Sequence, residues 1–172
     1  MEKKRGFRKY LPEFVYGAID GSVTTFAVVA GAVGASLSSA VILILGFANL
    51  FADGFSMAIS NYLSNKSDHE LNFKKKFEKK PLKSATATFI SFLVIGFAPL
   101  LFFVLALFYP GILKHAFLFS SILTGLAFLF VGFVKGEITG KHKGYSAIET
   151  FIIGGIASVI AFAVGYFLKG LG

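Results

Sequence analysis

Residues 38–64 read SSAVILILGFANLFADGFSMAISNYLS, a run of 27 residues whose one charged side chain is Asp53. A helix that crosses a bilayer needs about 20 predominantly apolar residues. At about 1.5 Å per residue the run measures about 40 Å, whereas the hydrocarbon core of a membrane is about 30 Å thick. We therefore predict a membrane-spanning helix here that projects beyond the bilayer.

Four further apolar runs surround this one, at about 14–36, 84–109, 115–134 and 145–168. The turn between the first two spans is so short that they must be antiparallel neighbours. Pro99 lies inside the third span and should bend it. None of the runs alternates apolar and polar residues as the strands of a membrane barrel do. The predicted fold class is all-α, an integral membrane bundle of five transmembrane helices that forms a single membrane domain over residues 1–172.

The composition agrees with a membrane protein and excludes several kinds of site. Hydrophobic residues make up 55% of the chain and charged residues 15%, against about 25% charged residues in an average soluble domain. The absence of Cys excludes disulfides, thiolate metal sites and Cys nucleophiles. The sequence contains no Ser-His-Asp constellation, no H-E-x-x-H motif and no phosphate-binding loop. We therefore expect a protein that is not an enzyme.

The basic residues predict the orientation of the bundle. Fifteen of the 17 Lys and Arg fall in the N-terminal arm, in the segment 65–83 and between the last two spans, and only Lys114 and Lys169 fall on the other side. The positive-inside rule then places the N-terminus in the cytoplasm, the C-terminus outside and a short basic cytoplasmic loop at 65–83. The net charge of +8 also favours anionic lipids at the cytoplasmic face, so no nucleic acid is needed to explain it.

No organelle-targeting peptide is apparent at the N-terminus. We therefore expect a multi-pass protein of a prokaryotic cell membrane.

Two carboxylates lie deep in the predicted spans. Asp20 is about 9 Å from the cytoplasmic edge of the first span, and Asp53 is about 12 Å from the same edge of the second. An ionised Asp near the bilayer centre costs about 2.5–3.5 kcal/mol on insertion scales, so such a residue is a functional candidate by default. Because the two helices are antiparallel neighbours, both side chains are expected at similar depth. Structural pairing with Lys or Ser donors is the alternative for each.

Asn49, Asp53 and Met57 follow one face of the second span at intervals of four residues. Together with Asp20 they offer carboxylate and amide oxygens and a thioether, a set that suits a transition metal such as Fe²⁺ better than Ca²⁺ or Mg²⁺. Two neighbouring carboxylates repel each other as anions, so protons should compete with metal for them. The pattern predicts a proton-coupled carrier of divalent cations. The plainer interpretations are packing for Met57 and a contact between helices for Asn49.

Secondary metal candidates are Glu149, one turn into the fifth span, and His69 and Glu70, which follow Asp68 in a basic segment. For Glu149 a structural or dimer-facing role is the alternative. For His69 and Glu70 the alternative is a solvated surface. A stripe of small residues that includes Gly17, Gly21 and Gly31 follows the first span and predicts a dimer seam.

Several motifs together resemble the vacuolar iron transporter family. They are DGSVTTFAVVAG at 20–31, NLFADGFSMAISNYLSNKS at 49–67, GFVKGEITG at 132–140 and YSAIETFIIGG at 145–155. The resemblance implies five helices with a cytoplasmic N-terminus, a homodimer with its pathway between the subunits, and export of Fe²⁺, often also Mn²⁺, in exchange for protons. The metal is the substrate, and no permanently bound cofactor is implied.

The same resemblance implies roles for individual residues. Asp20 matches an aspartate and Met57 a methionine on the family's metal pathway. Asn49 stands where many eukaryotic members have a glutamate, and Asp53, one turn further on, can supply the missing carboxylate. Eukaryotic members also carry a metal-collecting helical domain after the second helix, which the segment 65–83 is too short to form. A proton antiporter of small organic cations and a membrane protein without transport activity are the alternative functions.

Overall fold

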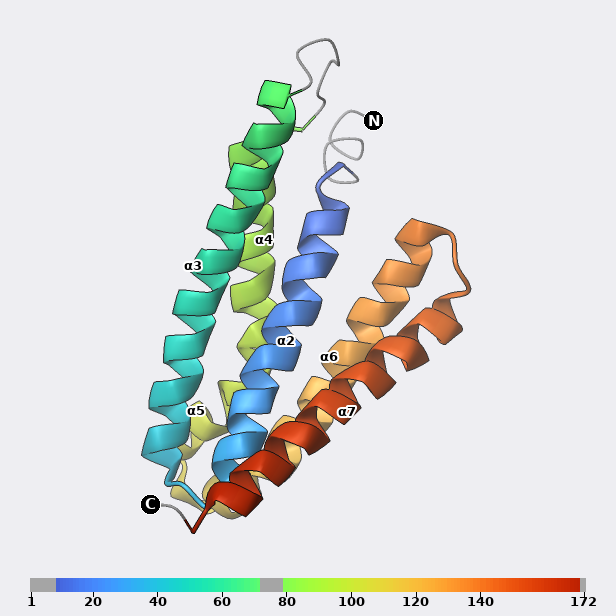
Figure 1. Cartoon of the computed structure of the whole chain (residues 1–172). Helices are drawn as coiled ribbons and strands as arrows, with labels where there is room; N and C mark the ends of the chain where they lie inside the picture. The colour runs from blue at the N-terminus through green and yellow to red at the C-terminus, as the bar shows by residue number, and fades with distance from the viewer. Residues whose placement is uncertain (1–8, 72–78, 171–172) are drawn as a thin grey trace.

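The computed structural model describes residues 9–71 and 79–170, and all regular structure within these two ranges is helical. The helices run antiparallel in a bundle that is splayed toward one end (Figure 1). Their bounds are α2 Leu11–Gly34, α3 Ser39–Leu71, α4 Pro81–Gly96, α5 Leu101–Phe108, α6 Ala116–Thr139 and α7 Lys143–Leu168, with short 3-10 helices η1 at Ala98–Leu100 and η2 at Pro110–His115.

Five segments within the described residues are long and apolar enough to cross a membrane, which confirms the predicted five-helix bundle. α3 has 33 residues and continues to Leu71, beyond the end that we predicted at residue 64. Side-chain contacts explain this extension. The Asn65 amide nitrogen donates to the Asn61 carbonyl oxygen at 2.8 Å, and Lys66 lies 3.8 Å from Glu70. The first part of the predicted loop is therefore helical, and residues 72–78 of that loop lie outside the described residues.

Pro99 interrupts the third span as predicted. α4 ends at Gly96, η1 follows, and α5 completes the span. A proline has no backbone N–H, so it cannot continue the hydrogen-bond ladder of the helix. The carbonyl group of Pro99 instead accepts a hydrogen bond from the Ser120 hydroxyl of α6. The bend is thus tied to the neighbouring span by a buried polar contact.

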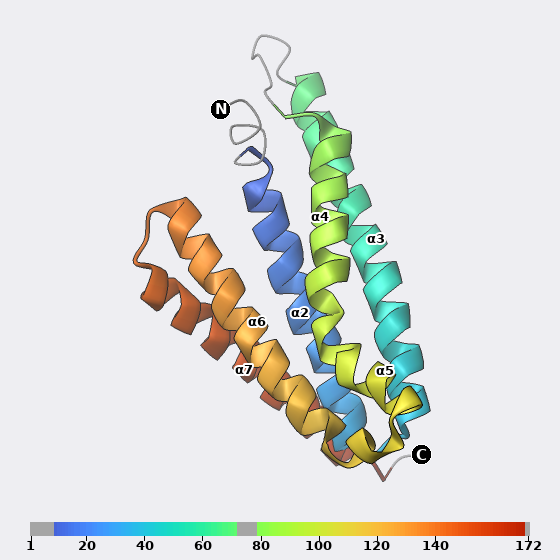
Figure 2. The ribbon, with the colours of Figure 1, turned by 180° about the vertical axis from the view of Figure 1, so that it is seen from behind.

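α2 lies at the centre of the bundle and packs on α3, α4, α6 and α7 (Figures 1 and 2). Glycines allow the closest approaches. A Cβ on Gly17 would lie 2.3 Å from the Thr88 carbonyl oxygen of α4, and one on Gly21 would lie 2.5 Å from that of Phe92. Gly31 faces the backbone of α7. The small-residue stripe that we assigned to a dimer seam therefore packs against other helices of the same chain.

The ends of the helices define two ends of the molecule. α2, α4 and α7 begin, and α3 and α6 end, at the same end of the bundle, which we call the basic end because Lys9, Lys79, Lys80, Lys141 and Lys143 lie there (Figure 1). The positive-inside rule predicts that the basic end faces the cytoplasm. Lys114 and Lys169 lie near the opposite end.

Candidate functional site: a carboxylate pair between two spans

Asn49 joins α3 to α2 in the middle of the bundle. Its side-chain amide nitrogen donates to the Thr24 hydroxyl at 3.4 Å and to the Thr25 hydroxyl at 3.3 Å. The Thr24 hydroxyl in turn donates to the carbonyl oxygen of Asp20 at 2.9 Å. These contacts set the register of the two helices at the depth where the candidate ligands lie.

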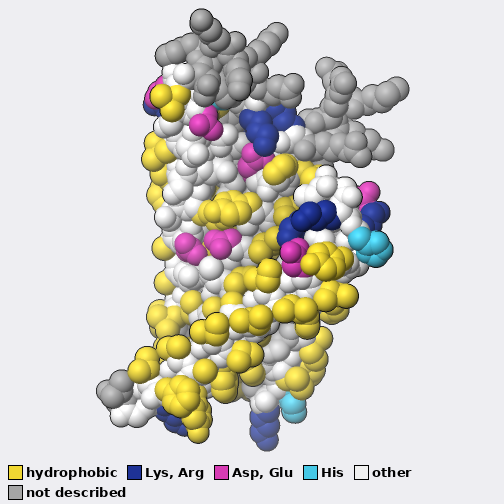
Figure 3. All heavy atoms as spheres, turned by 45° about the vertical axis from the view of Figure 1, so that its right-hand side comes forward, with side chains coloured by type: hydrophobic (Ala, Val, Ile, Leu, Met, Phe, Trp, Pro, Cys, Tyr) yellow, Lys and Arg dark blue, Asp and Glu magenta, His cyan; other side chains and the backbone are white. Residues whose placement is uncertain are grey.

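The register brings two acidic side chains together. Asp20 lies one turn before Thr24 on α2, and Asp53 lies one turn after Asn49 on α3. Because the helices are antiparallel, both steps lead toward the basic end, and the two carboxylates are close enough for their charges to interact. Both residues are partly exposed. Figure 3 shows acidic side chains gathered about halfway along the bundle and framed by hydrophobic surface.

Asn49 makes the contact between helices that we gave as its plainer interpretation. Its amide nitrogen is directed at the threonine hydroxyls of α2, so part of its side chain is occupied in holding the helices together. Thr24 and Thr25 were not among the sequence candidates. The sequence does contain a signal for them. Two hydroxyl side chains follow Asp20 by one turn, on a helix that must lie beside α3 because the connecting turn is so short.

Met57 belongs to the hydrophobic core. Its side chain is only 9% exposed and packs in the buried cluster that includes Leu50, Phe92 and Leu100. The structure thus places the thioether one turn from Asp53 along α3, within the core of the subunit. Within the described residues, no three His, Asp or Glu side chains are arranged so that they could hold a metal ion. The described part of the chain therefore presents a pair of carboxylates rather than a complete coordination shell.

Comparisons with known proteins agree with this arrangement of helices. A family model described as the VIT family matches residues 11–80 and 68–166 of the chain. The chain belongs to the VIT family. The two matched segments overlap at residues 68–80, from the end of α3 to the start of α4, at the connection that the resemblance marks as shortened.

Curated relatives of this VIT family chain bear transporter names. A "Vacuolar iron transporter" of Centaurea cyanus is 30% identical, with 88% of this chain and 85% of the relative covered. A protein of the same name in Toxoplasma gondii is 27% identical over 225 aligned positions, with coverage of 93% and 74%. "Vacuolar iron transporter 1" of Arabidopsis thaliana is 27% identical, with coverage of 88% and 83%. Because 225 positions exceed the 172 residues of this chain, the relative contains residues that this VIT family member lacks.

The secondary metal candidates of this VIT family chain lie apart from the carboxylate pair. Glu149 of α7 accepts a hydrogen bond from the Lys135 ammonium of α6 at 2.9 Å, so it joins the two helices of one hairpin. Glu70 lies near Lys66 on the projecting end of α3, and His69 lies beside it there.

Glu13 is a buried acid whose environment the sequence did not reveal. Its side chain is 9% exposed, and its Oε1 atom accepts from the Lys79 ammonium at 2.7 Å and from the Ser84 hydroxyl at 3.1 Å. The Oε2 atom is buried without a hydrogen-bond partner among the described residues. Glu13 thus anchors the segment that leads into α4 to the first turn of α2. The sequence indicates this contact only by placing Lys79 two residues before Pro81, which starts α4.

Proposed function

We propose that this VIT family protein is a transporter that exports Fe²⁺, and also Mn²⁺, from the cytoplasm by proton antiport. The observation that supports this most strongly is the pair of carboxylates from two neighbouring spans, Asp20 and Asp53. Acidic side chains inside a membrane segment are costly, and they occur mainly along substrate and proton pathways. The names of the curated relatives support iron as the substrate.

The carboxylate pair suits an exchange of protons for metal. Two neighbouring carboxylates repel each other when both are ionised, and either a proton or a divalent cation relieves this repulsion. Binding of one therefore competes with binding of the other. Carboxylate oxygens accept Mn²⁺ and Fe²⁺, and the geometry of the site decides between such ions more than intrinsic affinity does.

A homodimer would complete the coordination shell. Two carboxylates offer fewer ligands than the six that an octahedral ion takes, and the described part of one subunit has no third acidic or His ligand beside them. A second copy with its own Asp20 and Asp53 at the same depth would double the number of oxygen ligands. We therefore propose a dimer in which the two carboxylate pairs face each other.

The membrane that contains the protein forms part of this proposal. The relatives are named for vacuoles, whereas the sequence led us to expect a prokaryotic cell membrane. Fractionation of the source cells, followed by immunodetection of the protein, distinguishes the two locations.

Flux measurements in proteoliposomes test the proposed function. The purified protein is reconstituted with an internal metal-sensitive dye and an internal pH dye, and Fe²⁺ or Mn²⁺ is then added outside. We expect metal entry coupled to proton exit, with both lost in Asp20→Ala. Glu137→Gln is the control, since it removes an acid that pairs with Lys143 near the end of α6.

Each alternative function predicts a different result in the same experiment. If an organic cation blocks metal binding and itself drives proton exit, the substrate is organic. If neither the wild type nor the control variant binds or moves metal, the acids serve only to hold helices together.

A further inference from the structure

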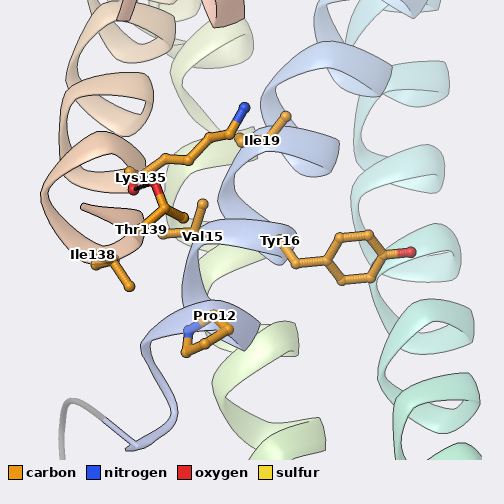
Figure 4. Close-up of a pocket in the computed structure, with 7 residues that line it drawn as sticks. All are labelled: Pro12, Val15, Tyr16, Ile19, Lys135, Ile138 and Thr139. Atoms are coloured by element: carbon orange, nitrogen blue, oxygen red, sulfur yellow. Dashed lines mark hydrogen bonds between the residues drawn. The ribbon is translucent and has the colours of Figure 1, made fainter. Parts of the chain in front are cut away.

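A cavity of about 280 Å³ lies between α2 and α6 at the basic end. Its walls include Val15 and Ile19 from α2 and Lys135 and Ile138 from α6 (Figure 4). The surface that faces the cavity is apolar, because Lys135 contributes its aliphatic stem while its ammonium binds Glu149. We call this cavity the α2–α6 crevice.

The crevice is closed toward the middle of the bundle and opens at the surface. Val15, Ala18 and Val131 form a buried apolar cluster, with Val134 and Ile138 packed against it, so the two helices are in contact there. Toward the basic end α6 and α7 diverge from α2 (Figures 1 and 2). An apolar space at this position disfavours water and favours hydrocarbon. In a bilayer the available hydrocarbon is a lipid acyl chain.

The charges around the mouth of the crevice favour a negatively charged lipid. Three of the described acids near this end pair with a lysine, in the pairs Glu13–Lys79, Glu149–Lys135 and Glu137–Lys143. Two more lysines, Lys9 before α2 and Lys141 after α6, form no ion pair with a described carboxylate. They stand at the ends of the two helices that form the walls. Counted over the described residues, the mouth therefore carries net positive charge.

We propose that the α2–α6 crevice binds one anionic phospholipid, with an acyl chain in the apolar cavity and the phosphate headgroup near Lys9 and Lys141. Basic sites between spanning helices on the cytoplasmic side are known to recognise such headgroups. The acyl chain lies against Ile19, the residue before Asp20. The lipid thus supports the part of α2 that carries the candidate ligand. This proposal rests on the membrane location of the bundle and holds whether or not the protein transports metal.

Native mass spectrometry of the full chain tests the site. The protein is delipidated in a mild detergent and mixed with equal amounts of phosphatidylglycerol and phosphatidylcholine that have identical acyl chains. We expect phosphatidylglycerol to be retained preferentially. Ile138→Trp should fill the crevice and abolish this retention, whereas Ile122→Trp, the same change at an exposed position on α6, should leave it intact.

A second pair of variants tests the headgroup contacts without altering any packing. Removing Lys9 and Lys141 as Gln variants should weaken phosphatidylglycerol retention by roughly fivefold for each lysine. The double variant Lys114→Gln with Lys169→Gln, at the opposite end, is the matched control. These changes leave the walls of the crevice intact, so the test remains valid if Ile138→Trp does not fold.

Three results would overturn the proposal. Equal retention of both lipids would show a crevice without headgroup preference. Unchanged retention in Ile138→Trp would place the bound lipid elsewhere. Loss of the dimer in Ile138→Trp, with lipid binding unaltered, would assign the crevice to contact with a second copy of the chain.

Discussion

The side-chain amide of Asn49 in α3 donates to the Thr25 hydroxyl of α2 at 3.3 Å, in the middle of two adjacent spans. Thr25 is fully buried and Asn49 is partly exposed, so this contact lies between the packed helices with its donor nearer the surface. A hydrogen bond in such a place stabilises one register of the two helices. The separation of Asp20 and Asp53 depends on that register.

Asn49→Ala should lower the free energy of unfolding by about 1 kcal/mol, because it removes a hydrogen bond between two membrane helices. It should also weaken metal binding, although Asn49 need not touch the ion. Thermal unfolding in detergent and titration with Mn²⁺ measure the two effects. Asn65→Ala is the control, since Asn65 bonds only within the projecting end of α3. A variant with weaker binding and unchanged stability would assign Asn49 to the metal instead.

Asp53→Asn should leave the metal-free protein at least as stable as the wild type, because the change removes repulsion from Asp20. The same variant should lose the stabilisation that Mn²⁺ provides, which is about 2.7 kcal/mol at a hundredfold excess over Kd. Thermal unfolding with and without Mn²⁺ separates the two effects. A metal-free Asp53→Asn protein that is clearly less stable than the wild type would indicate that the carboxylate only holds helices together.

Lys79→Met should lower the free energy of unfolding by about 2 kcal/mol. It leaves the buried carboxylate of Glu13 without its cation, and the loss falls below that of a fully buried pair because the Lys79 side chain is 35% exposed. Adding Glu13→Gln to this variant should restore much of the stability. The control is Lys143→Met, which breaks an exposed pair with Glu137 and should change stability by less than about 1 kcal/mol. Equal losses in Lys79→Met and in the control would show that the Glu13 pair contributes no more than a surface pair.

Gly17→Ala should destabilise the fold by about 1–3 kcal/mol, since the added methyl group meets the Thr88 carbonyl oxygen and α4 must move away. Gly155→Ala is the matched control, because a Cβ at that position meets nothing within 4 Å. Unfolding in detergent and analytical size exclusion provide the readouts. If Gly17→Ala altered the oligomeric state while the unfolding midpoint stayed constant, the small-residue stripe would belong to a seam between subunits.

The sequence was sufficient for the features that depend on chain geometry. Long apolar runs predict spans, a proline inside a run predicts its bend, and a very short turn forces two helices to be antiparallel neighbours. The fixed rise of a helix then aligns Asp20 with Asp53 in depth. The end of α3 was harder to predict, because polar residues can continue a helix outside the membrane when side chains one turn apart interact, as Lys66 and Glu70 do.

The sequence could not show in this way which face of each helix contacts which neighbouring helix. Gly17 could serve a seam inside or between subunits, and only the packing of α4 on α2 decides this. Met57 follows Asp53 by one turn, yet its side chain packs in the hydrophobic core. The spacing of residues along a helix does not show how far around the helix the packed face extends. The Glu13–Lys79 pair joins residues that are 66 positions apart, and such a contact arises from the tertiary arrangement alone.

The length of α3 has an architectural consequence. Its 33 residues measure about 50 Å, so about 20 Å of helix extends past a hydrocarbon core of about 30 Å. The buried residues of α3 extend only as far as Ala58, so a domain attached to the last turns of this helix need not disturb the core. The projecting end of α3 is therefore a position where an additional domain can be inserted. A module inserted between α3 and α4 would stand clear of the lipid, and the membrane part could gain or lose it as one piece.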